Sequence, residues 1–559
     1  MKAHYLPIVK ASDAAFDRSK RRITVDPRTP YTGAMDDMTY LVEPGNGAGL
    51  ISACCVLYSC EESRYYRDKE LLSIINNACS MFLRSSHPDG TIDFLATNYY
   101  TPATFEIQGF ARGYKVFIKY MSGTEDELEA QKNMKKALDL LSDGCLNGGF
   151  HTPNHRWVEC GAMLMSHNIL NKPALVKKVE SYLSEGIDCD EYGEFTERSM
   201  GSYNPINVNS MLTMAEEGGY TELYRYAKMN LDLTFKYLDG DGTLFTKNSR
   251  RLDSGYNDFF PAHAWYYLYL WAGEKFGDLR YLKFASDMFE SALSRGSIPA
   301  PLWLYLEKPQ LKTLEPDFSG VSIPDTYHAF YPNSNILRVR KEDFSYTLIC
   351  RNPDFLHIKF GSKTMTVRMC SSFFAVAQFA PEKIEKTDTG YRVRFSGHGE
   401  YKGLFPEPPP SPEWDKMDHS LRPVLHSCDL DYTVDITDRE DGFDMHILLD
   451  NTPFVPFKLE FVIPPDTRLE TESMIMDTYP GGTIAVKYGD MRLEDVKTAN
   501  EVTVRGLFAK HMYHQTMRGS IPQNKEAFTV YSTGFSPIDA AIRFDFTRRM
   551  AARAMDRKI

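Results

Sequence analysis

The segment HTPNHRWVEC gathers, within a few positions, side chains that could do chemistry. Its polar and aromatic members include Asn154, His155, Arg156, Trp157 and Glu159. The amide and the guanidinium can donate hydrogen bonds to an anion, and the imidazole can take up or release a proton near neutral pH. The indole offers a flat face on which another ring can stack. The alternative is a plain helix start, with Asn154 as the N-terminal cap and Trp157 in the core.

Three further segments carry side chains of the same kinds. They are 97–109 with Asn98, Tyr99 and Gln108, 190–204 with Glu194, Glu197, Arg198, Tyr203 and Asn204, and 247–263 with Arg250, Arg251, Tyr256 and His263. Each residue by itself would suit ordinary packing. Their recurrence in four loops predicts one shared site, provided that the fold brings these loops to the same face.

An internal repeat indicates how the fold could do this. A glycine turn followed by a short extended stretch recurs as PDGTIDF, NGGFHTP, YGEFTER and DGTLFTK, with glycines at 90, 149, 193 and 242. The intervals are 59, 44 and 49 residues. A repeated unit of roughly 50 residues, each a helical hairpin, is typical of a closed or partly closed α/α toroid. The repeated loops would then line a cleft on one face.

The elements between these loops are predicted to be helices. Apolar residues recur at three-four spacing, typical of a helix with a buried face. The segments are 48–62, 69–86, 104–121, 126–143, 157–170, 173–187, 205–218, 220–238, 261–277 and 279–296. Short connections between them favour antiparallel neighbours.

From about residue 325 the apolar period changes to two. Alternation is plain in GYRVRFSG, FDMHILLDN, FKLEFVIP, GTIAVKYG and AAIRFDF, with turn residues between them. Many short strands without intervening helices predict an antiparallel β-sandwich. We therefore expect an α+β multidomain chain, with an incomplete (α/α) toroid over 1–310 and the sandwich over 325–559. The proline-rich stretch 405–415 is expected to be an extended loop in the second half.

Composition excludes several classes of protein. The chain has 559 residues, of which 43% are hydrophobic and 13% aromatic, which is incompatible with general disorder. A net charge of −11 disfavours nucleic acid as the main partner. There is no nucleophile elbow, phosphate-binding loop or HExxH motif. The spacing of His151, His155 and Glu159 could suit a metal on a helix, but Pro153 interrupts that helix, and we predict no metal there.

No stretch of about 18 apolar residues is present, so no membrane span is predicted. The start of the chain lacks the apolar centre of a signal peptide. The predicted location is cytoplasmic, or periplasmic or secreted if a leader was removed before the numbering began.

The chain resembles the heparinase II/III-like polysaccharide lyases. The residues that carry the resemblance are PDGTIDFLATNYYTPATFEIQG, TPNHRWVECGAML and YGEFTERSMGSYN, with YPNSNILRVRKEDFSYTLICRNPDFLHIKFG in the second half. The resemblance covers about residues 90–540. It implies the same architecture, an N-terminal α/α toroid joined to a C-terminal antiparallel sandwich.

The resemblance also implies catalytic residues. Asn154 and His155 match the Asn-His pair that lies beside the uronate carboxylate, and Tyr203 matches the catalytic tyrosine. His357 matches the histidine that the sandwich contributes, with His328 as the alternative. The chain departs from the family pattern at Asn204, where a histidine often follows the tyrosine, and in LHIKFG, which lacks the usual His-Gly-His run.

The implied reaction is β-elimination at a 4-linked uronic acid. Donors neutralise the carboxylate so that the C5 proton becomes acidic, a base removes that proton, and an acid protonates the leaving O4. Tyr203 could serve as either the base or the acid. His155 would be the base or the partner of Tyr203, depending on which epimer is cleaved. The implied partner is an anionic uronate-containing glycan or oligosaccharide, and no cofactor is required. The sequence leaves open a structural divalent metal in the sandwich and the oligomeric state.

Two other functions stay open at this point. A toroid glycoside hydrolase would need paired carboxylates, for which the candidates are Asp188, Asp190, Glu194 and Glu197. A glycan-binding protein without catalysis would keep the aromatic residues and need neither His155 nor Tyr203.

Overall fold

The computed structural model describes residues 1–36, 41–94, 96–255 and 261–548. The chain divides into two compact units. The first comprises Met1–Tyr237 and Leu244–Ile323, and the second comprises Leu238–Thr243 and Pro324–Ile559. No helix in the described ranges is both long and apolar enough to span a membrane.

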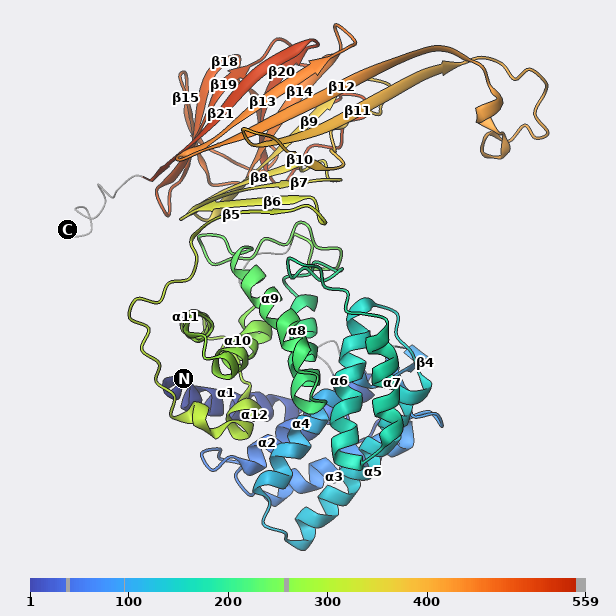
Figure 1. The fold of residues 1–559 in the computed structure, drawn as a ribbon, viewed down its shortest axis with the longest axis vertical. Helices are drawn as coiled ribbons and strands as arrows, with labels where there is room; N and C mark the ends of the chain where they lie inside the picture. Colours follow the sequence, from blue (N-terminus) through green and yellow to red (C-terminus); the bar gives the residue numbers. More distant parts are fainter. Residues whose placement is uncertain (37–40, 95, 256–260, 549–559) are drawn as a thin grey trace. The chain divides into compact units, whose positions relative to one another are not determined.

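The first unit is an incomplete α/α toroid, as predicted (Figure 1). Successive inner helices pack on one another. They are α2 (Pro44–Ser59), α4 (Thr104–Tyr120), α6 (Pro153–Leu170), α8 (Tyr203–Glu217) and α10 (Ala262–Phe276). The outer helices that alternate with them are α3 (Lys69–Ser85), α5 (Glu125–Asn147), α7 (Pro173–Ser184), α9 (Tyr224–Phe235) and α11 (Leu279–Ser294). All ten predicted helices are therefore present.

The two rings differ in how their residues are buried. In the inner helix α8 every residue from Asn207 to Ala215 is buried, so this helix contacts protein on all sides. In the outer helix α3 the buried residues form one stripe that includes Leu71, Ile75 and Phe82. Helices buried all round belong to the interior, whereas a single apolar stripe is typical of a helix with one face in water.

Two helices were not predicted. α1 (Lys2–Lys20) packs on α2 and on the short α12 (Leu302–Glu307). α1 is rich in polar residues, and its few buried side chains, among them Tyr5, Ile8 and Phe16, give only a weak three-four pattern. The predicted segment 220–238 is also divided, because a 3-10 turn, η1 (Thr221–Leu223), precedes α9. A second such turn, η2 (Pro309–Lys312), follows α12.

Two small sheets lie in the loops of this unit. β1 (Met35–Asp36) pairs with β2 (Val42–Glu43), and β3 (Ile92–Phe94) pairs with β4 (Ala96–Thr101). The second pair immediately precedes α4, so it lies next to the start of an inner helix.

The second unit is the predicted sandwich of two sheets. One sheet has nine strands in the order β10 (Ile384–Lys386), β11 (Tyr391–Lys402), β12 (Val424–Arg439), β13 (Gly442–Asp450), β21 (Ile538–Arg548), β19 (Asn500–Phe508), β18 (Tyr488–Asp495), β15 (Arg468–Thr471), β16 (Ile475–Asp477). The other has eight strands in the order β17 (Thr483–Ala485), β20 (Phe528–Phe535), β14 (Pro456–Ile463), β9 (Lys363–Ser371), β8 (Leu356–Phe360), β7 (Phe344–Ile349), β6 (Ile336–Lys341), β5 (Thr326–Tyr331). Among the described neighbours only β17 and β20 run parallel.

The core of the sandwich follows from the alternation of side chains along each strand. In β8, Leu356, Ile358 and Phe360 belong to the apolar cluster between the sheets. His357 and Lys359 therefore point to the opposite face of their sheet.

The hairpin of β11 and β12 extends beyond the sheet to which it belongs (Figure 1). β12 pairs with β13 only from Asp431 onward, so 397–402 and their partners in β12 form a two-stranded ribbon. The loop at its tip includes the predicted proline-rich stretch and two short turns, η3 (Trp414–Lys416) and η4 (His419–Leu421).

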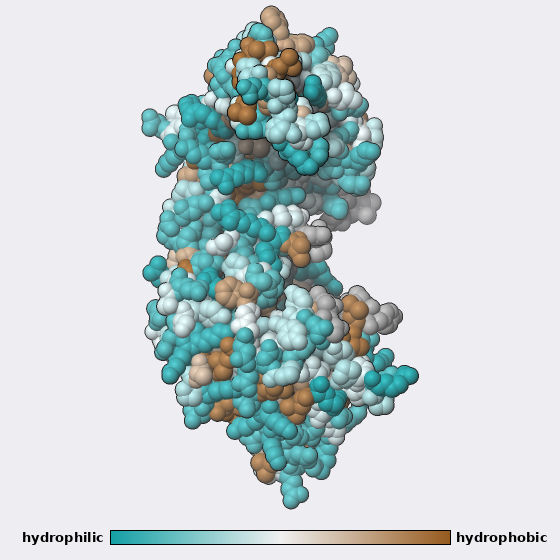
Figure 2. Space-filling model, turned by 90° about the vertical axis from the view of Figure 1, so that its right-hand side faces the viewer, coloured by the Kyte–Doolittle hydropathy of each residue, from teal (hydrophilic) through white to brown (hydrophobic). Residues whose placement is uncertain are grey.

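Apolar side chains are exposed at the tip of this hairpin. Leu404 is 86% exposed, Trp414 67% and Leu421 62%. Figure 2 views the side toward which the hairpin extends and shows apolar atoms gathered near the top of the picture, among hydrophilic surroundings.

The segment Leu238–Thr243 joins the second unit through buried charges. The Arg338 guanidinium donates to Asp239 Oδ1 at 2.9 Å, and Ser345 Oγ donates to the same oxygen at 2.7 Å. Lys359 Nζ lies 2.7 Å from Asp241 Oδ2. Burial alone would raise the pKa of Asp239, but the charges of Arg338 and Lys359 hold it below its usual value.

Replacing Arg338 tests this buried pair. Arg338 is 1% exposed and Asp239 is 4% exposed, so Arg338→Met leaves a buried carboxylate without the positive charge that is hydrogen-bonded to it. We expect the free energy of unfolding to fall by about 3–5 kcal/mol, measured by chemical denaturation. The double variant Asp239→Asn, Arg338→Met should recover part of that loss because no charge is then left unpaired. Equal losses in both variants would contradict this account.

Candidate active site

A buried carboxylate brings three of the predicted segments together. Asn154 Nδ2, in the first turn of α6, donates to both carboxylate oxygens of Glu197 at 2.9 Å. Arg251 Nε lies 3.4 Å from Glu197 Oε1, and the Arg251 guanidinium stacks over the Tyr203 ring at 4.4 Å from its centroid. Asn154, Tyr203 and Arg251 therefore belong to one cluster. Glu197 is only 4% exposed, and burial raises its pKa, although Asn154 and Arg251 lower it.

His155 borders the same cluster. Its ring meets the Phe105 ring edge-on at 5.0 Å between centroids and the His151 ring at 4.6 Å. Burial is the main cause that lowers its pKa from 6.5 to about 4, and electrostatic interactions with His151 and Arg251 contribute to the same shift. The imidazole is therefore neutral near pH 7 and can accept a proton.

Asp253 fixes the positions of Tyr203 and Arg251. Ser199 Oγ donates to Asp253 Oδ1 at 2.8 Å, and the Gly201 amide donates to Asp253 Oδ2 at 2.8 Å. The Tyr203 amide, at the start of α8, donates to Ser199 Oγ at 3.0 Å. Because Asp253 lies two residues after Arg251, these bonds hold the start of α8 against the arginine segment.

Asn154 has a different position from the one predicted. The N-cap of α6 is Thr152, and Pro153 occupies the first helical position, where its fixed φ suits a helix start. Asn154 is fully buried, and its amide nitrogen donates to Glu197 and to Thr152. It is therefore neither the cap nor, in this arrangement, a donor to a substrate carboxylate.

Trp157 also differs from the prediction of a sugar-stacking platform. It is fully buried, and its indole nitrogen donates to Asp188 Oδ1 at 2.6 Å. No face of the ring is open to a ligand. The alternative reading, Trp157 in the core, is correct.

Three further candidate residues have structural contacts, in packing or in ion pairs. Gln108 is 5% exposed and donates to the Val158 carbonyl at 2.9 Å. Glu159 is 1% exposed with Lys178 at 3.5 Å, and burial raises its pKa to about 7. The Arg156 guanidinium donates to Glu185 at 2.9 Å.

The remaining candidates of the first unit lie at the surface or partly buried. Asn98 and Tyr99 are exposed on β4, Arg250 is exposed beside Arg251, and Arg198 is half-buried. His263 is exposed, with its ring nitrogen 2.9 Å from Ser297 Oγ. Tyr256 lies outside the described residues.

The two histidines predicted in the sandwich lie in the second unit. His357, on β8, is 3% exposed, and its Nδ1 lies 3.3 Å from Thr366 Oγ1, within hydrogen-bond distance. His328, on β5, is exposed and stacks on Tyr391 at 5.5 Å between ring centroids.

Two residues of the site had no predicted catalytic or substrate-binding role in a lyase. Phe105 is 40% exposed and contacts His155, yet an aromatic residue in the first turn of a helix looks like a core position in the sequence. Glu197 was predicted to lie on the shared face, and otherwise only as a hydrolase carboxylate. Across the ranges that the structure describes, no group of three or more His, Cys, Asp or Glu residues is placed to hold a metal ion.

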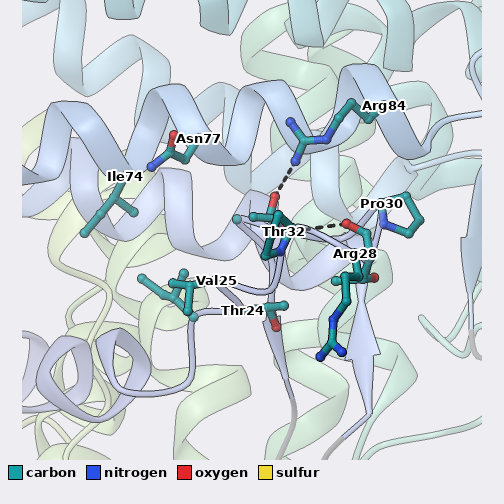
Figure 3. A pocket seen from close by; sticks show the side chains of 12 residues that line it. Thr24, Val25, Arg28, Pro30, Thr32, Ile74, Asn77 and Arg84 are labelled. Carbon is teal, nitrogen blue, oxygen red and sulfur yellow. Dashed lines mark hydrogen bonds between the residues drawn. The ribbon is translucent and has the colours of Figure 1, made fainter.

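A cavity of about 610 Å³ lies elsewhere in the first unit (Figure 3). It is lined by residues 23–33 and by α3, and Arg84 donates to the Thr32 carbonyl at its edge at 2.6 Å. None of the candidate residues above lines it, so it is not part of the candidate site.

The pKa of His155 can be measured by NMR with carbon-13-labelled histidine, assigned through His155→Gln. We expect a midpoint of about 4. Arg251→Met should raise this midpoint toward the ordinary 6.5, because the positive charge of Arg251 opposes protonation. The matched control is Arg250→Met, which removes a neighbouring exposed charge and should leave the midpoint unchanged. The same shift in both variants would show that Arg251 has no specific place beside His155.

Comparison with known proteins rests on solved structures. No protein-family model matches the chain, and no curated protein matches its sequence. A heparan sulfate lyase from Pedobacter heparinus matches with a TM-score of 0.52 and 9% identity, covering 89% of this chain and 76% of the lyase. The Streptomyces coelicolor A3 chondroitin AC lyase matches with 0.53 and 12%, covering 99% and 81%. A Paenibacillus xanthan lyase matches with 0.57 and 9%, covering 99% of this chain but 58% of the lyase. The chain therefore has the fold of polysaccharide lyases, as the resemblance predicts.

Proposed function

We propose that this chain is a polysaccharide or oligosaccharide lyase that cleaves a 4-linked uronic-acid glycan by β-elimination. The observation that carries the proposal is the cluster of Tyr203 and neutral His155, at the starts of α8 and α6, with Arg251 from the segment between α9 and α10. The fold shared with lyases that act on anionic polysaccharides supports it.

Arg251 is the donor best placed to neutralise the uronate carboxylate. The resemblance gives this role to Asn154, but that amide is buried against Glu197. The Arg251 guanidinium has five N–H donors, and its side chain is 27% exposed. A two-pronged hydrogen bond to the carboxylate would draw electron density from C5 and make its proton acidic.

His155 and Tyr203 then divide the proton transfers. His155 is neutral at pH 7, so its free ring nitrogen can take the C5 proton. As the C5–H bond breaks, the electron pair forms the C4–C5 double bond and the C4–O bond breaks. The Tyr203 hydroxyl gives its proton to the leaving O4. The products are a saturated chain end and an unsaturated uronate.

Other residues bind and orient the glycan. Phe105 and Tyr99 are exposed aromatic side chains that suit stacking on sugar rings. Arg198 and Arg250 suit further carboxylates or sulfates. His357 and His328 lie in the second unit, and their participation stays a prediction.

The described geometry gives little support to a hydrolase. Each candidate carboxylate already has a structural hydrogen bond: Asp188 with Trp157, Asp190 with the Tyr192 amide, Glu194 with Tyr237 and Glu197 with Asn154. A hydrolase needs one carboxylic acid and one carboxylate free to face the glycosidic bond.

Ultraviolet absorbance tests the proposal, because elimination creates a C4–C5 double bond conjugated to the carboxylate. The substrates would be heparan, chondroitin, alginate, ulvan and plant-gum fragments. We expect absorbance to rise with one of them. Tyr203→Phe should lower that rate by about 10²–10⁴-fold while glycan binding persists, because the variant lacks only the acidic proton.

Tyr220→Phe is the matched control for this experiment. Tyr220 lies in the connection after α8, away from the cluster, and its variant should keep full activity. Release of sugars without new absorbance would replace the lyase by a hydrolase. Binding that is unaltered in Tyr203→Phe, with no turnover by either protein on any glycan, would favour a binding protein.

A further inference from the structure

The hairpin of β11 and β12 has no further strand beside its outer end (Figure 1). Neighbouring strands cover only its base, because β10 pairs with 391–393 of β11 and β13 pairs with β12 from Asp431 onward. Thr452 Oγ1 donates to the Asp429 carbonyl at 2.7 Å and so occupies the next position of β12. In the part of the chain that the structure describes, the edge of β12 that faces away from β11 is therefore bare over 424–428.

A bare edge can take up another strand. It presents a row of backbone N–H and C=O groups, and proteins normally protect such a row with proline or with charged side chains. The sequence of 424–428 is VLHSC, which contains no proline and no Asp, Glu, Lys or Arg. A ribbon of two strands is also only marginally stable in water by itself. Both observations indicate that a partner covers this edge.

The tip of the hairpin, residues 402–423, is folded. The Arg422 guanidinium lies 3.9 Å from the centre of the Phe405 ring, and its Nε donates to His419 Nδ1 at 3.2 Å. The His419 ring packs on Trp414 at 4.1 Å between centroids. Among the described residues, the tip has no hydrogen bond, ion pair or ring contact outside its own hairpin. It is thus a formed structure that the rest of the chain does not use.

The tip and the adjoining ribbon expose apolar side chains. Leu404, Trp414 and Leu421 are between 62% and 86% exposed, and Tyr401 and Leu425 are 65% and 60% exposed. These five residues expose roughly 800 Å², which is about what each partner contributes to a stable protein interface. A patch of that size on a single chain indicates an interaction surface.

The charge of the tip disfavours an anionic partner. Its four carboxylates exceed its three cationic side chains, which gives a net charge of −1: Glu407, Glu413, Asp415 and Asp418 against Lys402, Lys416 and Arg422. Anionic membranes and anionic glycans attract clusters of Lys and Arg instead. A protein surface that carries apolar residues is therefore the better match.

Such a surface lies at the base of the same hairpin. Phe454 is 83% exposed and Phe535 is 41% exposed, and we call these two residues the basal patch. The Phe454 amide donates to the Ser536 carbonyl at 2.7 Å, which places it beside Phe535. Phe454 belongs to the loop whose Thr452 bonds to Asp429, so the basal patch lies near the end of the bare edge. The tip of the same chain is at the other end of the ribbon (Figure 1).

We propose that two copies of this chain form a two-fold dimer by exchanging these hairpins. The bare edges pair with each other in antiparallel orientation, with His426 at the two-fold axis, because the same strand must serve both sides of such an interface. In this register Leu421 of each copy lies opposite Asp431 of the other, where β13 ends and the loop to Phe454 begins. Each tip then covers the basal patch of the other copy.

Sedimentation velocity of the full chain tests the proposal. We expect a dimer with twice the 63.9 kDa mass of one chain. Leu421→Glu at the tip and Phe454→Lys at the basal patch should each raise the Kd of the dimer by about 100-fold, since each charge enters an apolar contact twice. Ile475→Glu is the matched control. Ile475 is 67% exposed on β16, at the far edge of the nine-stranded sheet, so the dimer should persist.

A mixture of the two dissociating variants tests the exchange itself. In a dimer of Leu421→Glu with Phe454→Lys, one contact between tip and basal patch is unaltered. The other contact brings the introduced carboxylate to the introduced ammonium. The mixture should therefore dimerise more tightly than either variant alone. Circular dichroism checks that each variant is folded, and no measurement depends on catalysis.

Four results would overturn the proposal. They are a monomer at every concentration at which the protein stays dissolved, a dimer that Leu421→Glu leaves intact, equal dissociation by Ile475→Glu, and a mixture no tighter than its components. A monomer would then be tested for co-sedimentation with vesicles of phosphatidylcholine and phosphatidylglycerol. Binding that is lost in Leu421→Glu would assign the tip to a membrane, and absence of binding would assign it to a different protein.

Discussion

The candidate site depends on one buried carboxylate and the two groups that compensate it. Glu197 would be costly to bury alone, since it is 4% exposed, but it accepts from Asn154 and lies beside Arg251. These interactions require the start of α6, the loop before α8 and the arginine segment to stay together. The arginine is thereby held over Tyr203 and close enough to His155 to lower its pKa. The residues proposed for proton transfer are positioned by a group that itself need not touch the glycan.

Much of the fold could be predicted from periodicity. Three-four spacing gave the ten helices of the two rings, and the recurring glycine turns indicated the toroid. The change to alternating apolar residues indicated the sandwich. α1 escaped prediction because its polar residues outnumber the few apolar side chains that it buries. This helix is stabilised by packing against α2 and α12, and the spacing of its own apolar residues is too weak to predict it.

The site was only partly predictable, and the reason is burial. His155, Tyr203 and Arg251 were predicted because their loops recur at the same point of each repeat, and the structure places Arg251 over Tyr203. The same reasoning included Trp157 and Gln108, which are buried, because an inner toroid helix contacts protein on all sides. Spacing along such a helix does not reveal which of its side chains are exposed and which are buried. Phe105 was missed for the converse reason, since its aromatic side chain suggests the core although it is exposed.

The short segment Leu238–Thr243 affects where the chain could be cut to produce the two units separately. It belongs to the second unit, although the sequence of the first unit continues on both sides of it. A sandwich made from residue 324 onward would lack Asp239 and Asp241, leaving Arg338 and Lys359 without these partners. A toroid ending at residue 323 would include this segment, but Asp239 and Asp241 would lack Arg338 and Lys359 as partners. The two units have different folds, but their sequences are interleaved. Neither unit is therefore complete when it is produced without the rest of the chain.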